Sequence, residues 1–121
     1  MPEELPPEVE RFVVALLLDL LNRFHSDPRQ AQAFEREVAM LARLAFTGAD
    51  AVGQCRAKRV EGVAAQAVHD RFRLPYARGA GAARAVMQRL GITCGGTAEE
   101  YQQQAERLRR YMAQWPEEAT P

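Results

Sequence analysis

Apolar residues recur at three- and four-residue steps along most of this chain, which is the spacing expected of amphipathic α-helices. Prolines, glycines and capping residues interrupt the pattern and divide it into five segments. We find no convincing run with the two-residue alternation of a strand. The pattern therefore predicts an all-α fold, a single-domain bundle of about five helices within residues 1–121. The expected helices cover about 7–24, 28–46, 50–72, 77–90 and 97–115.

Residues 6–46 are expected to form a helical hairpin. The segment Ser26-Asp27-Pro28 ends one helix and starts the next, because Asp27 can cap the new helix and Pro28 fits its first turn. The first helix carries apolar stripes on two opposite sides, and such a helix must be covered on both sides. It is therefore either the central helix of the domain or part of a subunit interface. In the second case a homodimer or another protein would contact the second stripe, formed by Val14, Leu18 and Leu21.

Residues 50–91 are expected to form a helix-turn-helix-like pair. Gly53 and Gly62 leave open whether its first helix is continuous. Pro75 ends that helix, since a proline disfavours helical geometry at the preceding residue. A short turn between two helices is the arrangement with which DNA-binding proteins place their second helix in the major groove.

The run Arg71–Arg78 is similar to the start of the recognition helix in the DNA-reading winged-helix domain of FtsK-type translocases. The chain departs from that family at Pro75, where the family turns on a glycine. It departs again after Ile92, where a helix opens and no hairpin wing follows. The similarity therefore covers the helix-turn-helix shape and does not extend to membership of the family.

The last predicted helix begins at a capping box, because Thr97 is followed three residues later by Glu100. Residues 97–115 place aromatic and aliphatic side chains on one face and Gln and Arg on the other, which indicates a C-terminal amphipathic helix. This helix is expected to stop at Pro116. The tail 116–121 is short and polar, and we expect it to be frayed.

The formal net charge is zero, with 16 Lys and Arg against 16 Asp and Glu, but the charges are unevenly distributed. Residues 1–53 have a net charge of −4, residues 54–92 of +6 and residues 93–121 of −2. A basic centre with acidic flanks is expected if the central helices meet a polyanion. It is also expected if the centre pairs with acidic helices of its own chain or of a second subunit. The sequence leaves both interpretations open.

Under the first interpretation, outward-facing side chains of the central pair contact nucleic acid. Arginines reach phosphates or guanine edges, and small residues such as Gly81 and Ala85 allow a close approach to DNA. The candidate nucleic-acid-binding residues are Lys58, Arg59, Arg73, Tyr76, Arg78, Arg84, Gln88 and Arg89.

The chain contains no complete catalytic motif, and we expect no enzyme activity. Cys94 precedes a helix N-terminus, where the pKa of a thiol can be lowered, but neither histidine lies near it in sequence to act as a base. The spacings of Cys55, His69 and Cys94 match no zinc-binding pattern. We therefore expect neither a metal nor a cofactor.

The residues also bear on compartment and origin. The N-terminus is acidic where a secretory signal is positive, and the apolar run Phe12–Leu18 ends at Asp19, before it reaches membrane-spanning length. Lys58 is the only lysine among 16 basic residues, and this arginine-rich, alanine-rich composition indicates a GC-rich bacterial genome, or a phage or plasmid living in one. We expect a cytoplasmic protein with free thiols and no membrane contact.

Together these observations favour a small cytoplasmic nucleic-acid-binding protein that acts as a dimer. It would be a DNA-binding transcriptional regulator or an accessory factor of a mobile element. The alternative is a non-catalytic helical protein-interaction module, such as an adaptor, inhibitor or assembly factor. Such a module would use the second apolar face of the first helix.

Overall fold

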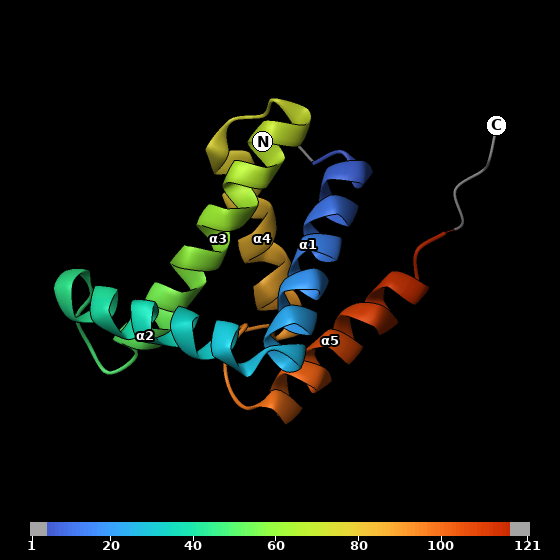
Figure 1. The fold of residues 1–121 in the computed structure, drawn as a ribbon. Coiled ribbons are helices and arrows are strands. Elements are labelled where there is room, and N and C mark those ends of the chain that lie inside the picture. Colours follow the sequence, from blue (N-terminus) through green and yellow to red (C-terminus); the bar gives the residue numbers. More distant parts are fainter. Residues whose placement is uncertain (1–4, 117–121) are drawn as a thin grey trace.

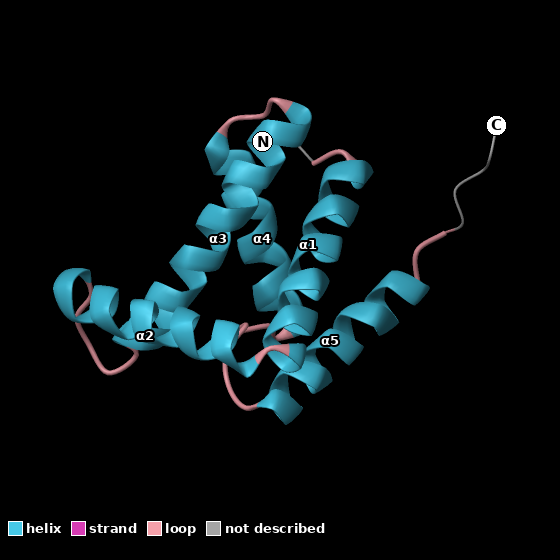
Figure 2. Ribbon diagram, viewed as in Figure 1, coloured by secondary structure: helices cyan, strands magenta, loops and turns pink. Residues whose placement is uncertain are grey.

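The computed structural model describes residues 5–116, which contain five α-helices and no strand. The all-α prediction is confirmed (Figure 1, Figure 2), and each helix ends within two residues of the predicted boundary. The tail that we expected to fray lies, apart from Pro116, outside the described residues. The helices are α1 (Pro7–Ser26), α2 (Pro28–Ala45), α3 (Ala51–Phe72), α4 (Tyr76–Leu90) and α5 (Ala98–Ala113).

Helix α1 is the central helix of the bundle and contacts all four other helices (Figure 1). Val13, Val14, Leu17 and Leu21 are completely buried, so both apolar stripes of α1 are covered by the same chain. This result decides between the two roles expected for the helix. Val14 and Leu21 are core residues, and Leu18 is half-buried against the same core. The prediction of a protein interface on this face of α1 is therefore wrong, because the face packs against helices of the same chain.

The helix ends follow the capping residues of the sequence. Asp27 accepts hydrogen bonds from the backbone N–H groups of Arg29, at 3.1 Å, and Gln30, at 3.4 Å, at the start of α2. Thr97 and Glu100 form the predicted capping box at the start of α5, with both hydrogen bonds 3.2 Å long. Local side-chain hydrogen bonds therefore set these two boundaries.

Helix α3 runs without a break through Gly53 and Gly62. Its first half packs on α2 around a small apolar cluster of its own, formed by Val38, Ala42 and Cys55. Its second half belongs to the main core, to which it contributes Val60, Ala64 and Val68. The long helix therefore joins two separate apolar clusters.

Helices α3 and α4 lie antiparallel and touch over most of the length of α4. Contacts join His69 to Tyr76 next to the turn, and Glu61 to Arg84 about two helical turns further on. In a DNA-reading helix-turn-helix the two helices instead cross at about 90–120°. The central pair is therefore closed into an αα-hairpin, in which one face of α4 is fixed on α3.

A buried glutamine fixes the loop between α4 and α5. The side-chain oxygen of Gln104 accepts hydrogen bonds from the N–H groups of Thr93, at 2.9 Å, and Cys94, at 3.0 Å. Its amide nitrogen donates to the carbonyl oxygen of Gly95, at 3.0 Å. Gln104 is only 6% exposed, so these bonds supply the partners that a buried polar group requires. The loop is thereby attached to α5.

Gly79 allows α3 and α4 to approach each other closely. A Cβ atom at this position would lie 2.9 Å from the Cα atom of Ala65 and 2.9 Å from the Cβ atom of Val68. These distances are shorter than van der Waals contact, and the first involves backbone that cannot move aside alone. A Cβ atom at Gly81, on the same helix, would meet no atom within 4 Å.

We predict that Gly79→Ala lowers the free energy of unfolding by about 1–3 kcal/mol, because the added methyl group forces the two helices apart. Gly81→Ala is the matched control, and it should raise the free energy of unfolding by about 0.5–1 kcal/mol through helix propensity alone. Urea titrations of both variants measure the two values. A shift of both midpoints in the same direction would contradict the close contact at Gly79.

Candidate nucleic-acid interface

Helix α2 neutralises two arginines of the basic centre. Arg56 donates two hydrogen bonds to the carboxylate of Glu35, each 2.7 Å long, and Arg59 pairs with Glu37 on the same helix. The hydrogen bonds to Glu35 raise the pKa of Arg56, against the opposing effect of its partial burial. Both arginines therefore hold α3 on α2.

Two of the three arginines of α4 that the sequence assigns to nucleic acid, Arg84 and Arg89, also form ion pairs within the chain. Arg84 donates hydrogen bonds of 2.8 and 3.2 Å to one carboxylate oxygen of Glu61, and these raise the pKa of Arg84. Lys58 Nζ lies 3.8 Å from the same oxygen. Arg89 donates a 2.7 Å hydrogen bond to Glu10 of α1. These cations are exposed, but each has a carboxylate partner on its own chain.

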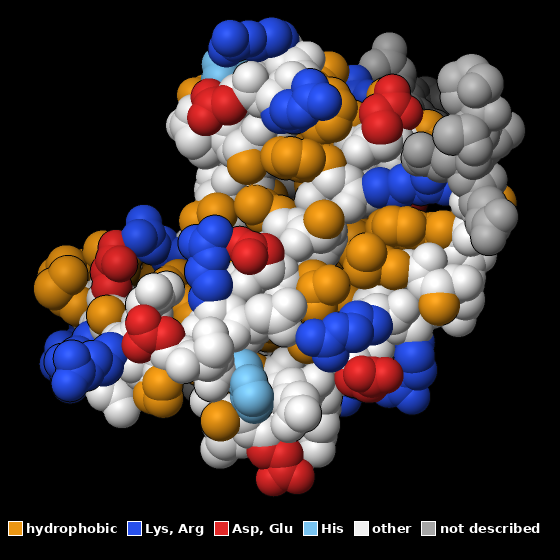
Figure 3. Space-filling view, turned by 45° about the vertical axis from the view of Figure 1, so that its right-hand side comes forward, with side chains coloured by type: hydrophobic (Ala, Val, Ile, Leu, Met, Phe, Trp, Pro, Cys, Tyr) orange, Lys and Arg blue, Asp and Glu red, His pale blue; other side chains and the backbone are white. Residues whose placement is uncertain are grey.

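Three further arginines of the basic centre lie around the turn between α3 and α4. Arg71, Arg73 and Arg78 fall within eight residues of chain around this turn. Asp70 is the single acidic residue between positions 62 and 98. Figure 3 shows basic side chains at this end of the molecule, along the upper edge of the view, with acidic side chains below them on either side. Arg71 and Arg73 are exposed, and neither forms an ion pair with a carboxylate among residues 5–116.

Aromatic contacts hold the turn in place. Phe72 packs edge-on against Phe12 of α1, with ring centroids 5.3 Å apart. The guanidinium of Arg71 lies 5.3 Å from the centre of the Phe72 ring. Across the turn, Tyr76 stacks on His69 with ring centroids 4.6 Å apart. The basic residues are therefore carried by a turn that is anchored on α1 and on α3.

The structure brings together three of the eight residues predicted to bind nucleic acid. Arg73, Tyr76 and Arg78 lie at the turn, within six residues of one another along the chain. The other predicted residues lie further along α3 or α4, where most of them form the ion pairs described above. They are Lys58, Arg59, Arg84, Gln88 and Arg89.

Two residues of the turn are missing from the predicted set, Arg71 and His69. A helical wheel does not single out Arg71, because the last turn of a helix is exposed on more sides than its interior. The alternation Arg71-Phe72-Arg73 is the signal that identifies it. In the structure Phe72 is half-buried, and the arginines on either side of it are exposed.

Cys94 lies in the core and not at a reactive surface. The residue is completely buried, and desolvation raises the pKa of its thiol to about 12. A thiol with this pKa is protonated at neutral pH and is a poor nucleophile. The position of Cys94 before a helix N-terminus therefore does not activate it.

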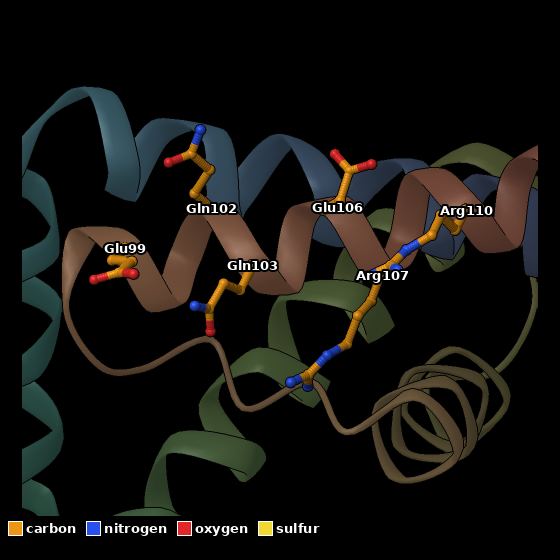
Figure 4. Close-up of a pocket in the computed structure, with 6 residues that line it drawn as sticks. All are labelled: Glu99, Gln102, Gln103, Glu106, Arg107 and Arg110. Carbon is orange, nitrogen blue, oxygen red and sulfur yellow. The ribbon is translucent and has the colours of Figure 1, made fainter.

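A surface hollow of about 470 Å³ follows the polar face of α5. Figure 4 shows its side chains arranged along the helix, with Arg107 reaching to the loop, where it donates a 2.8 Å hydrogen bond to the carbonyl oxygen of Gly91. A small-molecule site needs enclosing, largely apolar walls. This hollow lacks them, because its lining residues are all polar and exposed: Glu99, Gln102, Gln103, Glu106, Arg107 and Arg110.

No protein-family model matches this chain, and no curated protein or solved structure is significantly similar to it. None of the helices described here is long and apolar enough to span a membrane. The function is therefore inferred from the residues and their geometry.

We predict that the native protein shows no fast-reacting thiol. At pH 8 a pKa of about 12 leaves only about one Cys94 thiol in ten thousand ionised, and Cys55 is also buried, with 2% of its surface exposed. Titration with Ellman's reagent should give two thiols rapidly in guanidinium chloride and none rapidly in buffer. One equivalent of rapid reaction in buffer would show that a cysteine is accessible and activated.

Proposed function

We propose that this protein binds nucleic acid through the turn between α3 and α4. The observation that carries the proposal is the distribution of charge after ion pairing. Arg56, Arg59, Arg84 and Arg89 have carboxylate partners within the chain, whereas Arg71 and Arg73 of the turn are exposed and form no ion pair with a carboxylate of the described residues. Positive charge that is not balanced locally is what attracts a phosphate backbone.

The αα-hairpin favours contact with phosphates over insertion of α4 into a major groove. Arg84 and Arg89 are tied to Glu61 and Glu10, so two of the side chains that would read base edges from α4 have other partners. The arginines of the turn lie at one end of the hairpin, where a backbone can pass without entering between helices. Contacts of this kind give affinity that is strongly salt-dependent and weakly dependent on sequence.

Roles as a transcriptional regulator or as an accessory factor of a mobile element, in the cytoplasm of a bacterium or of a phage-infected cell, would both use such binding. The salt-dependent phosphate contacts proposed here serve an accessory role more directly than the reading of an operator sequence, which requires contacts to base edges.

The alternative function, a protein-interaction module, has less support. It relies on the face of α1 that carries Val14 and Leu21, and these residues have no exposed surface. A partner protein or a second copy of the chain could reach them only by opening the fold. The exposed large apolar side chains of the described region lie elsewhere, on α2, α3 and α4: Met40, Leu44, Val52, Val63 and Tyr76.

We predict that Arg71→Ala/Arg73→Ala weakens binding to a mixed-sequence duplex and to a single strand of the same length. The affinity at low salt should fall about tenfold or more, and the slope of log K against log salt should shrink by about 2, one for each lost phosphate contact. Fluorescence anisotropy of labelled oligonucleotides over a series of salt concentrations measures both quantities.

The control is Arg36→Ala/Arg43→Ala, which makes the same change in net charge on the exposed surface of α2. Its slope and its affinity should stay close to those of the unmodified protein. Equal losses in the two double variants would show that net charge alone matters and would overturn the assignment to the turn. Absence of binding by the unmodified protein at low salt would remove the proposed function.

A further inference from the structure

The aromatic ring of Tyr76 is fixed in an exposed position at the tip of the αα-hairpin. One face of its ring lies on the ring of His69, with centroids 4.6 Å apart and planes inclined by 23°. Its hydroxyl group donates a 3.3 Å hydrogen bond to the side-chain oxygen of Gln66. With these contacts in place Tyr76 is still 50% exposed. The ring therefore rests on α3 by one face and presents its remaining surface to solvent.

The residues beneath Tyr76 are themselves fixed. His69 Nδ1 lies 3.2 Å from the carbonyl oxygen of Leu74, which joins the imidazole to the turn. The side-chain amide of Gln66 donates a 2.8 Å hydrogen bond to Asp70. The orientation of the tyrosine ring is thus set before any ligand arrives, so little conformational freedom is lost when a second flat group stacks on it.

Two exposed arginines lie close to this ring along the chain. Arg71 and Arg73 precede Tyr76 by five and three residues, and the acidic residue of the same segment, Asp70, accepts a hydrogen bond from Gln66. An exposed aromatic ring bordered by arginines is the combination with which proteins hold unpaired nucleotides. The ring stacks on a base, and the cations follow the phosphates on either side.

We propose that Tyr76 is a stacking platform for an unpaired base of single-stranded nucleic acid, with Arg71 and Arg73 on the neighbouring phosphates. This inference rests on the nucleic-acid binding proposed above and names its preferred ligand. A duplex can contact the arginines through its phosphates but cannot stack on the ring, because the faces of its bases are already stacked on one another. A single strand can make both kinds of contact. Stacking accepts every base, so the site has little sequence preference.

The experiment compares two probes of equal length and charge, an oligothymidylate and an abasic oligonucleotide with the same number of phosphates. The unmodified protein should bind the oligothymidylate about tenfold more tightly, because only this probe offers bases. Tyr76→Leu should abolish that preference and leave the affinity for the abasic probe unchanged. Tyr76→Phe keeps the ring and should retain the preference. Arg71→Ala/Arg73→Ala should weaken the binding of both probes by the same factor.

The outcomes separate this inference from the function on which it rests. If the unmodified protein binds both probes equally well and the double arginine variant binds neither, Tyr76 is not a stacking platform. Phosphate binding at the turn would then still be supported. Failure of both probes to bind removes the proposed function as well. A Tyr76→Leu variant that binds the abasic probe normally is folded at this site. The loss of preference is then due to the missing ring, and the Tyr76→Phe variant checks this independently.

Discussion

Burial of the two apolar stripes of α1 is the constraint on which the rest of the structure depends. A fully buried valine or leucine contributes about 1.5–3 kcal/mol relative to an exposed one, and α1 supplies Val9, Val13, Val14, Leu17 and Leu21. A helix with apolar residues on two sides cannot be covered by one neighbour. Helix α5 packs on it, and so does the hairpin of α3 and α4. The order of helices around the bundle follows from this requirement.

That arrangement also decides what the charged residues do. With α2 and α1 held against the central hairpin, the carboxylates of Glu35 and Glu10 lie where arginines of α3 and α4 can reach them. The pair of Arg56 and Glu35 is part-buried, whereas the more exposed pair of Arg89 and Glu10 contributes little to stability, about 0–1 kcal/mol. Their larger effect is on the electrostatic potential around the molecule, because each pair neutralises a positive charge at the surface. Arg71 and Arg73 of the turn form no such pair among the described residues, so their charge remains at the surface.

The parts of the fold that local chemistry determines could be predicted from the sequence. Asp27 and Thr97 mark helix starts because each caps its own helix, and Pro75 marks the turn because it restricts its own neighbourhood. The role of α1 could not be settled this way, since two apolar stripes show that a helix is covered but not by which chain. The same applies to the candidate site. Whether Arg89 faces a partner depends on Glu10, which lies 79 residues away in sequence.

Arg73 illustrates how the turn combines two demands in one residue. It ends α3 in the left-handed conformation, with φ at 60°, where helices usually place glycine. A residue with a Cβ atom costs about 1 kcal/mol more there than glycine does. Glycine would relax the backbone but would remove a cation from the tip of the hairpin. The stability of the turn and the positive charge at its tip therefore make opposite demands on this position.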